Sequence, residues 1–266
     1  MIELANVTQV FNHGTVNEVT AIKNLSLKID EGDFITVIGS NGAGKTTLLN
    51  VIAGAVFPTG GKVFINNKNI TKLHEYKRSK LIGRIFQNPL LGTAGSMSIE
   101  QNMALSIKKG FRLFTLALNR SKRERFREEL KTLNMGLENR LKDTVGLLSG
   151  GQRQALTLLT TVLSRPALLL LDEHTAALDP GNAEAVMRLT RDFIESYKMT
   201  AVMITHNMQQ AIDYGNRLVM FSDGEIIFDI KGEEKSNLTV AKLVAKFKEI
   251  KNEMMNSDEI LLDTGV

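Results

Sequence analysis

The sequence contains no cysteine and no tryptophan, and only four of its 266 residues are proline. Without cysteine, disulfide bonds and thiolate metal sites are excluded, and nothing points to an oxidising compartment. Long apolar runs are missing too, since Ala167–Leu171 is far shorter than the roughly 20 residues of a membrane-spanning helix. The start, Met1–Asn6, lacks the basic and apolar segments of a secretory leader. We therefore expect a soluble cytoplasmic protein.

The composition is that of a globular protein without a strong charge bias. Hydrophobic residues make up 43% of the chain, which is enough to fill the core of one large domain or two small ones. The 33 basic and 29 acidic residues leave a formal net charge of +4. This charge permits contact with an anionic surface but does not require one.

A glycine-rich segment predicts a phosphate-binding loop. Gly39, Gly44, Lys45 and Thr46 occupy every fixed position of the pattern G-x-x-x-x-G-K-[ST], in which backbone N–H groups cradle phosphates. Residues 34–38 before it predict a buried strand, and the residues after it predict a helix whose N-terminus points at the phosphates. The residues expected to bind the nucleotide here are Gly39, Ser40, Asn41, Gly42, Ala43, Gly44, Lys45, Thr46 and Thr47.

A pair of carboxylates predicts the second half of the site. Residues 168–171 form a continuous apolar run, typical of a buried parallel strand, and Asp172 and Glu173 follow it directly. A carboxylate at such a strand end binds Mg²⁺, directly or through water, and the next acid can polarise the attacking water. We expect Lys45 to reach the β- and γ-phosphates and the Thr46 hydroxyl to hold Mg²⁺.

The order of the expected elements indicates α/β organisation with an inserted helical part. Alternating or continuous apolar residues predict strands at 2–7, 25–29, 34–38, 63–65, 82–86, 167–171, 201–205, 218–221 and 225–228. Helical periodicity predicts helices at 45–55, 99–107, 122–133, from about 152, and at 182–197. We divide the chain into an ATP-binding core (1–87 and 166–230), a helical subdomain (88–165) and a C-terminal helix and tail (231–266).

Two apolar features allow more than one interpretation. Phe11 lies in a polar stretch together with residues 12–17, which predicts a surface loop, and its ring either stacks on a base or anchors the loop to the core. Near the end, residues 240–250 present an apolar helical face with Thr239 as the candidate N-cap. This face either packs on its own domain or contacts a partner or membrane surface. The tail from about residue 252 is expected to be only loosely held.

A second anion-binding corner follows from Leu148–Gln152. Ser149, Gly150 and Gly151 stand before a predicted helix N-terminus and again offer bare amides and a helix dipole. This corner carries no lysine of the kind found at position 45. Two anion-binding corners in one chain are expected if two chains form shared nucleotide-binding sites, each site using one corner from each chain.

With these residues in place, the chain resembles the nucleotide-binding subunit of an ABC transporter over nearly its whole length. The matching motifs are Gly39–Thr46, Gln87, Leu148–Gln152, Leu168–Glu173, Ala177–Asp179 and His206. The resemblance implies an α/β P-loop NTPase fold of the ABC type, with a mixed β core, an inserted helical subdomain and an N-terminal antiparallel β subdomain. It also implies ATP and Mg²⁺ as cofactors, and ATP hydrolysis coupled to transmembrane transport as the activity.

The resemblance assigns roles to single residues. The implied catalytic residues are Lys45, Gln87, Glu173 and His206, the metal-binding residues are Thr46, Gln87 and Asp172, and further nucleotide contacts are Phe11, Ser149, Gly150, Gly151, Gln152 and Asp179. Phe11 would stack on adenine and His206 would contact the γ-phosphate. His174 stands where many members have proline, and we expect it to be an outward loop residue rather than a metal ligand.

The resemblance also implies partners. Two subunits, either identical or paralogous, would form a head-to-tail dimer in which the phosphate-binding loop of one faces Ser149 and Gly151 of the other across two ATP molecules. Residues 88–143 would receive an integral membrane permease, which would hold the chain at the cytoplasmic face of the membrane. The basic run 119–127 is most simply a solvated helix face, with contact to anionic lipid headgroups as the alternative.

Among ABC proteins, the chain resembles bacterial importers of amino acids. The stretch between Gln87 and Ser149 is similar to uptake ATPases of the branched-chain type and to a group associated with tryptophan or tyrosine uptake, which implies an extracellular solute-binding protein in the complex. A separate-chain exporter would share every motif. An ABC ATPase acting on ribosomes or DNA is a second alternative, but it would be expected to have tandem domains or a long coiled-coil insertion, so we expect no nucleic-acid partner. Cargo, transport direction, the identity of the permease and any regulatory role of the C-terminal helix stay open.

Overall fold

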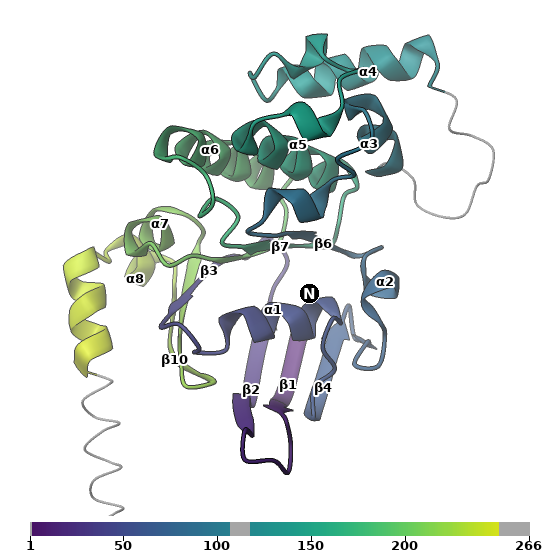
Figure 1. The fold of residues 1–266 in the computed structure, drawn as a ribbon. Coiled ribbons are helices and arrows are strands. Elements are labelled where there is room, and N and C mark those ends of the chain that lie inside the picture. The colour runs from purple at the N-terminus through teal and green to yellow at the C-terminus, as the bar shows by residue number, and fades with distance from the viewer. Residues whose placement is uncertain (1, 107–117, 250–266) are drawn as a thin grey trace, which may run out of the picture.

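The computed structural model describes residues 2–106 and 118–249, which form two β-sheets with helices around them (Figure 1). The smaller sheet has the order β2-β1-β4-β5 and consists of β1 (Ile2–Phe11), β2 (Val19–Ile29), β4 (Gly60–Ile65) and β5 (Lys68–Asn69). Its neighbouring strands pair antiparallel. The predicted N-terminal antiparallel subdomain is thereby confirmed.

The larger sheet has six strands in the order β10-β9-β3-β8-β7-β6. Its strands are β3 (Phe34–Gly39), β6 (Ile82–Ile85), β7 (Leu168–Asp172), β8 (Ala201–Ile204), β9 (Arg217–Ser222) and β10 (Glu225–Lys231). All neighbours pair parallel except β10, which forms an antiparallel hairpin with β9. This mixed sheet confirms the predicted core, and the carboxyl ends of β3, β6, β7 and β8 lie along one edge.

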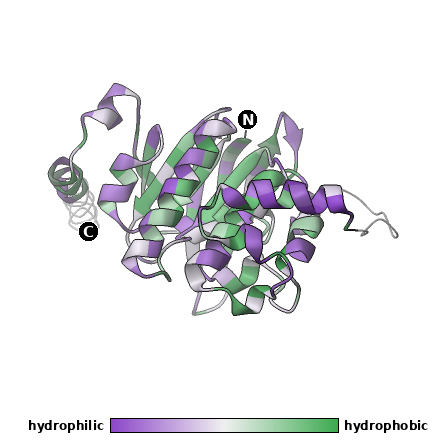
Figure 2. Ribbon diagram, turned by 90° about the horizontal axis from the view of Figure 1, so that it is seen from above, coloured by the Kyte–Doolittle hydropathy of each residue, from purple (hydrophilic) through white to green (hydrophobic). Residues whose placement is uncertain are grey.

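Helices cover both faces of the larger sheet. On one face lies α1 (Lys45–Ala53), while α5 (Gly150–Leu163) and α6 (Pro180–Ser196) cover the other (Figure 1). The other described helices are α2 (Glu75–Arg78), α3 (Ile99–Ser106), α4 (Arg120–Lys131), α7 (Met208–Asp213), α8 (Glu233–Ser236), the C-terminal helical residues 240–249 and three 3₁₀ turns, η1 (Pro89–Gly92), η2 (Leu137–Asn139) and η3 (Val145–Leu147). Figure 2 shows hydrophobic residues concentrated in the central strands and hydrophilic ones on the outer helix surfaces.

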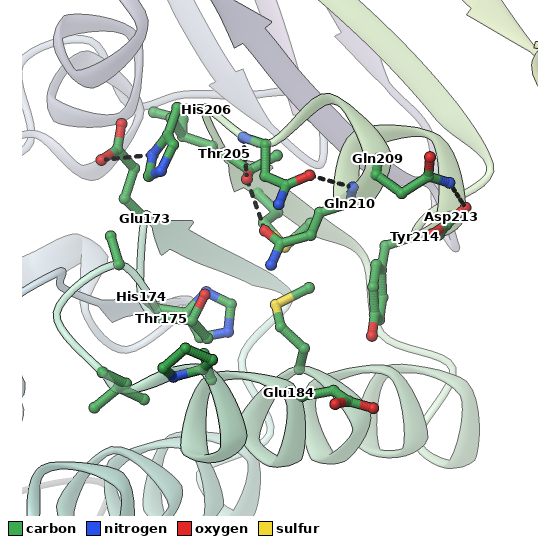
Figure 3. A pocket seen from close by; sticks show the side chains of 18 residues that line it. Glu173, His174, Thr175, Glu184, Thr205, His206, Gln209, Gln210, Asp213 and Tyr214 are labelled. Carbon is green, nitrogen blue, oxygen red and sulfur yellow. Dashed lines mark hydrogen bonds and ion pairs between the residues drawn. The ribbon is translucent and has the colours of Figure 1, made fainter. Parts of the chain in front are cut away.

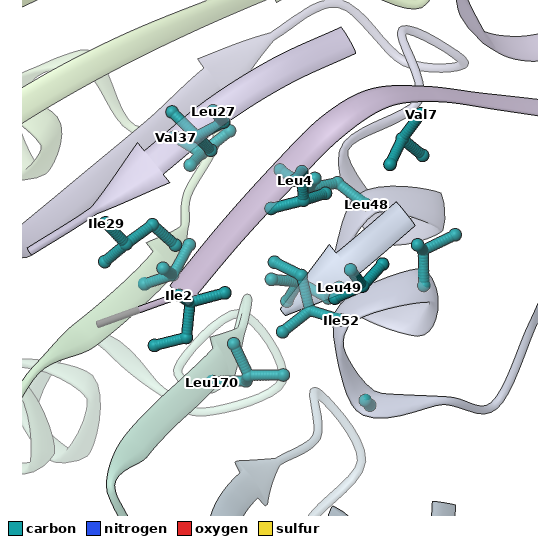
Figure 4. Close-up of a cluster of buried hydrophobic side chains, with 14 of the residues drawn as sticks. Ile2, Leu4, Val7, Leu27, Ile29, Val37, Leu48, Leu49, Ile52 and Leu170 are labelled. Carbon is teal, nitrogen blue, oxygen red and sulfur yellow. The ribbon is translucent and has the colours of Figure 1, made fainter. Parts of the chain in front are cut away.

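The alternation of side chains along β7 explains its continuous apolar run. Leu168 and Leu170 join the cluster that holds Leu48 and Leu49 of α1, and Figure 4 shows Leu170 in this cluster. Leu169 and Leu171 join the cluster of α5 and α6 on the other face. Because successive side chains of a strand point to opposite faces, a strand covered on both sides must be apolar throughout. The buried strand β7 therefore places Asp172, its last residue, between two hydrophobic layers.

A buried arginine fixes the far end of α1. Arg78 is 1% exposed, and its guanidinium donates to the carbonyls of Val51 and Ile52 at 2.8 Å and to that of Leu73 at 2.8 Å. A cation at a helix C-terminus satisfies the last carbonyls and interacts favourably with the helix dipole. The helix that follows the phosphate-binding loop is thus anchored at its C-terminal end.

Three predicted helix starts lie two residues too far along the chain. The side chains of Asn119, Ser149 and Asp179 cap α4, α5 and α6 by accepting backbone N–H groups of the first turn. A capped helix begins directly after its cap, so polar residues without helical periodicity also enter the first turn.

The stretch around Phe11 differs from the prediction. Phe11 is the last residue of β1 and pairs with Val19 of β2, so it lies in a strand rather than in a surface loop. Pairing along the long strand β2 overrides the polar composition of the neighbouring residues, because strand formation depends strongly on cross-strand context.

The C-terminal helical face packs on its own domain, as one of the two interpretations predicts. Residues 240–249 are helical, Thr239 caps them by accepting the Lys242 N–H at 3.3 Å, and Leu243 is completely buried beside Ile38 and Met220. The tail from about 252 lies outside the described residues. No helix in residues 2–106 and 118–249 is long and apolar enough to cross a membrane.

Candidate active site

The larger sheet brings the predicted catalytic residues to one edge. The phosphate-binding loop follows β3, Asp172 and Glu173 end β7, His206 follows β8, and Gln87 follows β6. These four strands are parallel neighbours, so their carboxyl ends meet at the same side of the sheet. A crevice at the carboxyl edge is where open α/β sheets bind ligands.

The phosphate-binding loop needs glycine for steric reasons at two positions. Gly39 and Gly44 have φ values of 151° and 103°, and a Cβ at either would lie 2.2 Å from a backbone oxygen, that of Phe221 or Ala21. Gly44 also occupies the N-cap of α1, where no side chain caps the first turn. The open backbone N–H groups at this helix N-terminus form an anion-binding corner. Ser40, Asn41, Gly42, Ala43, Thr46 and Thr47 complete the loop.

Lys45 lies folded across the loop. Its ammonium donates to the carbonyls of Gly39 and Ser40, both at 2.8 Å, and the residue is 7% exposed. Burial lowers the pKa of Lys45, while the neighbouring carboxylates of Glu173 and Asp172 act in the opposite direction. These two hydrogen bonds, which have a charged donor, hold the ammonium at the loop, where phosphate oxygens could take the place of the carbonyls.

Asp172 and Glu173 have different surroundings although they are adjacent. Asp172 Oδ2 accepts a hydrogen bond from Arg84 Nη2 at 3.1 Å. Glu173 has a φ of 45°, a left-handed conformation that is uncommon for a residue with a Cβ, and its carboxylate lies 3.5 Å from Nδ1 of the exposed His206. Strained backbone of this kind concentrates at functional sites. A hollow of about 630 Å³ between α6 and α7 is lined by Glu173 and His206 among others (Figure 3).

The oxygen donors at this edge fit Mg²⁺. The described residues contain no group of three or more His, Cys, Asp or Glu that could hold a metal ion by themselves. Mg²⁺ does not need such a group, because it keeps several waters and binds one or two protein oxygens together with substrate phosphates. The Thr46 hydroxyl is exposed, and no hydrogen bond or ion pair within the described residues engages Asp172 Oδ1. Gln87 is also exposed and adds an amide oxygen.

His174 is the clearest correction to the sequence analysis. It is 1% exposed rather than an outward loop residue, and its Nε2 lies 2.9 Å from the Thr190 hydroxyl of α6. Because that hydroxyl donates to the Val186 carbonyl at 2.8 Å, Nε2 is assigned as the donor to the hydroxyl oxygen. Burial lowers the pKa of His174 to about 4. The imidazole ties the loop after β7 to α6.

The second anion-binding corner lies on a different layer of the molecule. Ser149 caps α5 in a capping box with Gln152, and both Ser149 and Gly150 are exposed. Gly151 packs on α6, where a Cβ would lie 2.6 Å from Asn182. Since α5 and α1 cover opposite faces of the sheet, the two corners do not form one site within a single chain (Figure 1).

Asp179 and Phe11 also make contacts that belong to the fold itself. Asp179 caps α6 and accepts from the Asn182 N–H and side-chain amide, and these hydrogen bonds lower the pKa of Asp179. Phe11 is half-buried at the end of β1, beside the strand whose Ala21 oxygen touches Gly44 of the phosphate-binding loop. The ring therefore lies on the sheet that borders the loop.

Two residues of this region were missed in the sequence analysis. Arg84 contacts the Asp172 carboxylate, and Gln154 donates hydrogen bonds to the carbonyls of Phe86 and His174. A charged residue within the predicted strand 82–86 was a usable signal for Arg84, because a buried strand rarely carries an unpaired charge. For Gln154, inside a helix of mixed composition, no such signal existed.

The fold and the loop geometry define a P-loop nucleoside triphosphatase, and comparison with known proteins gives the family. The ABC transporter family profile matches residues 22–176. The tyrosine transport ATP-binding protein of Clostridioides difficile is 40% identical, over 93% of this chain and 99% of that protein. The chain belongs to the ABC transporter family as an ATP-binding domain, and its activity as a member is ATP hydrolysis.

Further relatives agree with this assignment. The phosphonates import ATP-binding protein PhnC of Lactobacillus delbrueckii subsp. bulgaricus is 33% identical, over 88% of this chain and 91% of that protein. A solved dimeric structure of MJ0796, a bacterial ABC transporter cassette, matches with a TM-score of 0.72 at 30% identity, over 87% of this chain and 98% of that one. The predicted ABC-type fold is confirmed, and so is the resemblance to ATPases of amino-acid uptake.

Proposed function

We propose that this chain is the ATP-hydrolysing subunit of an importer for an amino acid or a similar small solute. It works as a head-to-tail dimer, with an identical or a paralogous subunit, on a separate membrane permease. The observation that carries this proposal is the separation of the two phosphate corners onto opposite faces of one sheet. The corner at the phosphate-binding loop has the lysine and the carboxylates. At the other corner, the start of α5, Ser149 and Gly150 are exposed, so a second chain is needed to bring the two corners together.

Each subunit supplies most of one catalytic site. The backbone N–H groups of residues 39–47 and the Lys45 ammonium bind the phosphates, and the Thr46 hydroxyl and Asp172 carboxylate hold Mg²⁺, with Gln87 as a further oxygen donor. The metal, when bound, neutralises charge on the β- and γ-phosphate oxygens. Glu173 takes the proton of the attacking water, and His206, held beside Glu173 at 3.5 Å, contacts the γ-phosphate.

The remaining contacts with ATP are those to its adenine ring and those made by the second subunit. Phe11 stacks on the adenine ring. Ser149, Gly150, Gly151 and Gln152 of the second subunit close over the triphosphate, with Asp179 at the subunit boundary. Groups supplied in trans are worth roughly 10³ to 10⁵ in the rate of phosphoryl transfer, so a dilute monomer should turn over slowly.

A surface beside Gln87 suits the permease. Leu90 and Leu91 of η1 are 59% and 64% exposed, immediately after the loop that holds Gln87. The two leucines form a small exposed apolar patch, and a permease could extend it into a larger apolar contact. Docking there would place this chain at the cytoplasmic face of the membrane and would couple the Gln87 loop to the permease.

The names of the relatives support import and an amino-acid cargo. One is a tyrosine transport protein, and others are import proteins for methionine and for phosphonates. We include an extracellular solute-binding protein as a partner in the proposal, as the resemblance to bacterial importers implies. In this proposal the cargo is bound by the permease and the solute-binding protein.

The proposal is tested by purifying tagged Glu173→Gln protein from solubilised native membranes in the presence of ATP and identifying its partners by mass spectrometry. We expect a polytopic permease together with an extracellular binding protein, and an ATP-dependent dimer on size-exclusion chromatography. A variant with Leu90→Asp and Leu91→Asp should lose the permease but keep the dimer. A permease without any binding protein would indicate an exporter, and ribosomal or DNA-repair proteins without a permease would overturn the transport assignment.

A further inference from the structure

Arg84 and Asp172 form a sheltered ion pair at the edge of the active site. Arg84 Nη2 donates to Asp172 Oδ2 at 3.1 Å, and the two side chains are only 11% and 13% exposed. Arg84 pairs with Leu170 in the parallel register of β6 and β7, so Asp172 lies two residues further along the neighbouring strand, on the same face. Ion pairs with so little solvent contact are screened far less than surface pairs.

The arginine is also held from its other side. Its guanidinium carbon lies 4.6 Å from the centre of the Phe86 ring, within the range of a cation–π contact. Phe86 is in turn fixed through its carbonyl, which accepts from Gln154 at 3.1 Å. The guanidinium is therefore kept in one place, and it engages only one of the two oxygens of Asp172.

Stability alone does not account for this pair. A buried ion pair is often no more stabilising than well-packed hydrophobic residues, because both charges lose their hydration. Arg84 moreover leaves its Nε buried without a hydrogen-bond partner in the described structure, which is unfavourable. Ile82, on the same face of β6, shows that this layer accepts an aliphatic side chain. A charged side chain at a position where it is unfavourable for stability indicates a functional role for Arg84.

We propose that Arg84 is the positioning residue of the metal site: it holds Asp172 through Oδ2 and leaves Oδ1 for the Mg²⁺ that accompanies ATP. The proposal rests on the proposed role of Asp172 as a metal ligand. Groups that hydrogen-bond a metal ligand orient it, and removing them typically lowers metal affinity about 10- to 100-fold. Because Arg84 lies on the strand that leads into Gln87, the same contact links the metal ligand to the loop proposed to meet the permease.

The test measures how strongly Mg²⁺ increases nucleotide affinity. The dissociation constant of a fluorescent ATP analogue is determined with excess Mg²⁺ and with excess EDTA, and the ratio of the two is compared between variants. We expect Arg84→Gln and Arg84→Met to bind the analogue in EDTA within about twofold of the parent and to lose about tenfold or more of the Mg²⁺ effect. Arg84→Lys, which keeps the charge, should recover part of it.

Two control variants separate the possible outcomes. Arg217→Gln removes another sheltered arginine, paired with Asp229 at 2.6 Å at the amino end of β9, and should leave the ratio unchanged. Asp172→Asn should greatly reduce the Mg²⁺ effect, although Thr46 and the phosphates still offer oxygen donors. If it does not, the metal role of Asp172 is wrong; if it does but both neutral Arg84 variants keep the parent ratio, only the role of Arg84 is wrong. A larger Mg²⁺ effect in Arg84→Gln would mean that Arg84 competes with the metal, and it would also overturn the proposal.

Discussion

The Gln154 side-chain amide donates a hydrogen bond of 2.7 Å to the carbonyl of His174, and the same amide donates to the carbonyl of Phe86 at 3.1 Å. His174 directly follows Glu173, and Phe86 directly precedes Gln87. Gln154 itself lies in α5, the helix that begins at Ser149. The buried side chain of Gln154 therefore joins α5, whose N-terminus is the second anion-binding corner, to two loops. One loop carries Glu173, the proposed general base, and the other carries Gln87.

Replacing the Gln154 side chain should lower the free energy of unfolding. Gln154→Met keeps the approximate volume but removes both hydrogen bonds and leaves two carbonyls without their partner. We expect the free energy of unfolding to fall by about 1 to 3 kcal/mol, because buried polar groups without partners are unfavourable. Urea denaturation measures this change. Gln209→Met on the exposed surface of α7 is the control and should stay within about 0.5 kcal/mol of the parent. Equal stability of the two variants would contradict the structural role of Gln154.

The carboxylate of Glu173 should be needed for turnover but not for ATP binding. Glu173→Gln keeps the shape of the side chain and removes its ability to take a proton. We expect the rate of phosphate release to fall by roughly 10² to 10⁴, the usual contribution of a general base. ATP affinity should stay within a few-fold, and the ATP-bound dimer should persist. Phosphate release within a factor of two of the parent would rule out this role.

The ammonium of Lys45 should be needed for binding itself. In the structure it donates to the Gly39 and Ser40 carbonyls and lies beside two carboxylates, so it is already placed at the loop that would receive phosphates. Lys45→Ala removes that charge, and we expect ATP affinity in an equilibrium titration to fall at least tenfold. Lys72→Ala, which removes an exposed lysine outside the loop of residues 39–47, should bind ATP like the parent. Unchanged affinity in Lys45→Ala would refute the placement.

The sequence predicted most of what motifs and periodicity can encode. The phosphate loop, the paired carboxylates and the buried strands follow from local patterns, because glycine geometry and alternation depend on neighbouring residues only. His174 shows the limit. Its burial depends on Thr190, sixteen positions further along and on another element, which no local pattern reveals. Gln154 was missed for the same reason, since the two carbonyls that it contacts lie on separate loops. Arg84 differs, because a charge within a predicted buried strand was a local signal for it.

His174 should make stability depend on pH. Its pKa is lowered by burial from 6.5 to about 4, so the folded protein keeps the ring neutral at pH values where the unfolded chain binds a proton. Where the unfolded state binds more protons, stability rises with pH, so the contribution is complete above about pH 6.5 and is lost as the pH falls toward 4. Between pH 7 and pH 5 this amounts to roughly 2 kcal/mol.

The comparison of two histidine variants isolates this contribution. His174→Gln retains a hydrogen-bond donor for the Thr190 hydroxyl but cannot take up a proton in this range, so its unfolding free energy should change less between pH 7 and pH 5 than that of the parent. His13→Gln removes a histidine whose ion pair with Glu18 lies at the surface, where such pairs contribute little, so it should change the pH dependence less than His174→Gln does. The quantity to compare is the difference in unfolding free energy between the two pH values, from denaturant titrations, rather than stability at either pH. If His174→Gln retains the full pH dependence, the acid sensitivity arises from other groups, and the buried neutral imidazole is not its source.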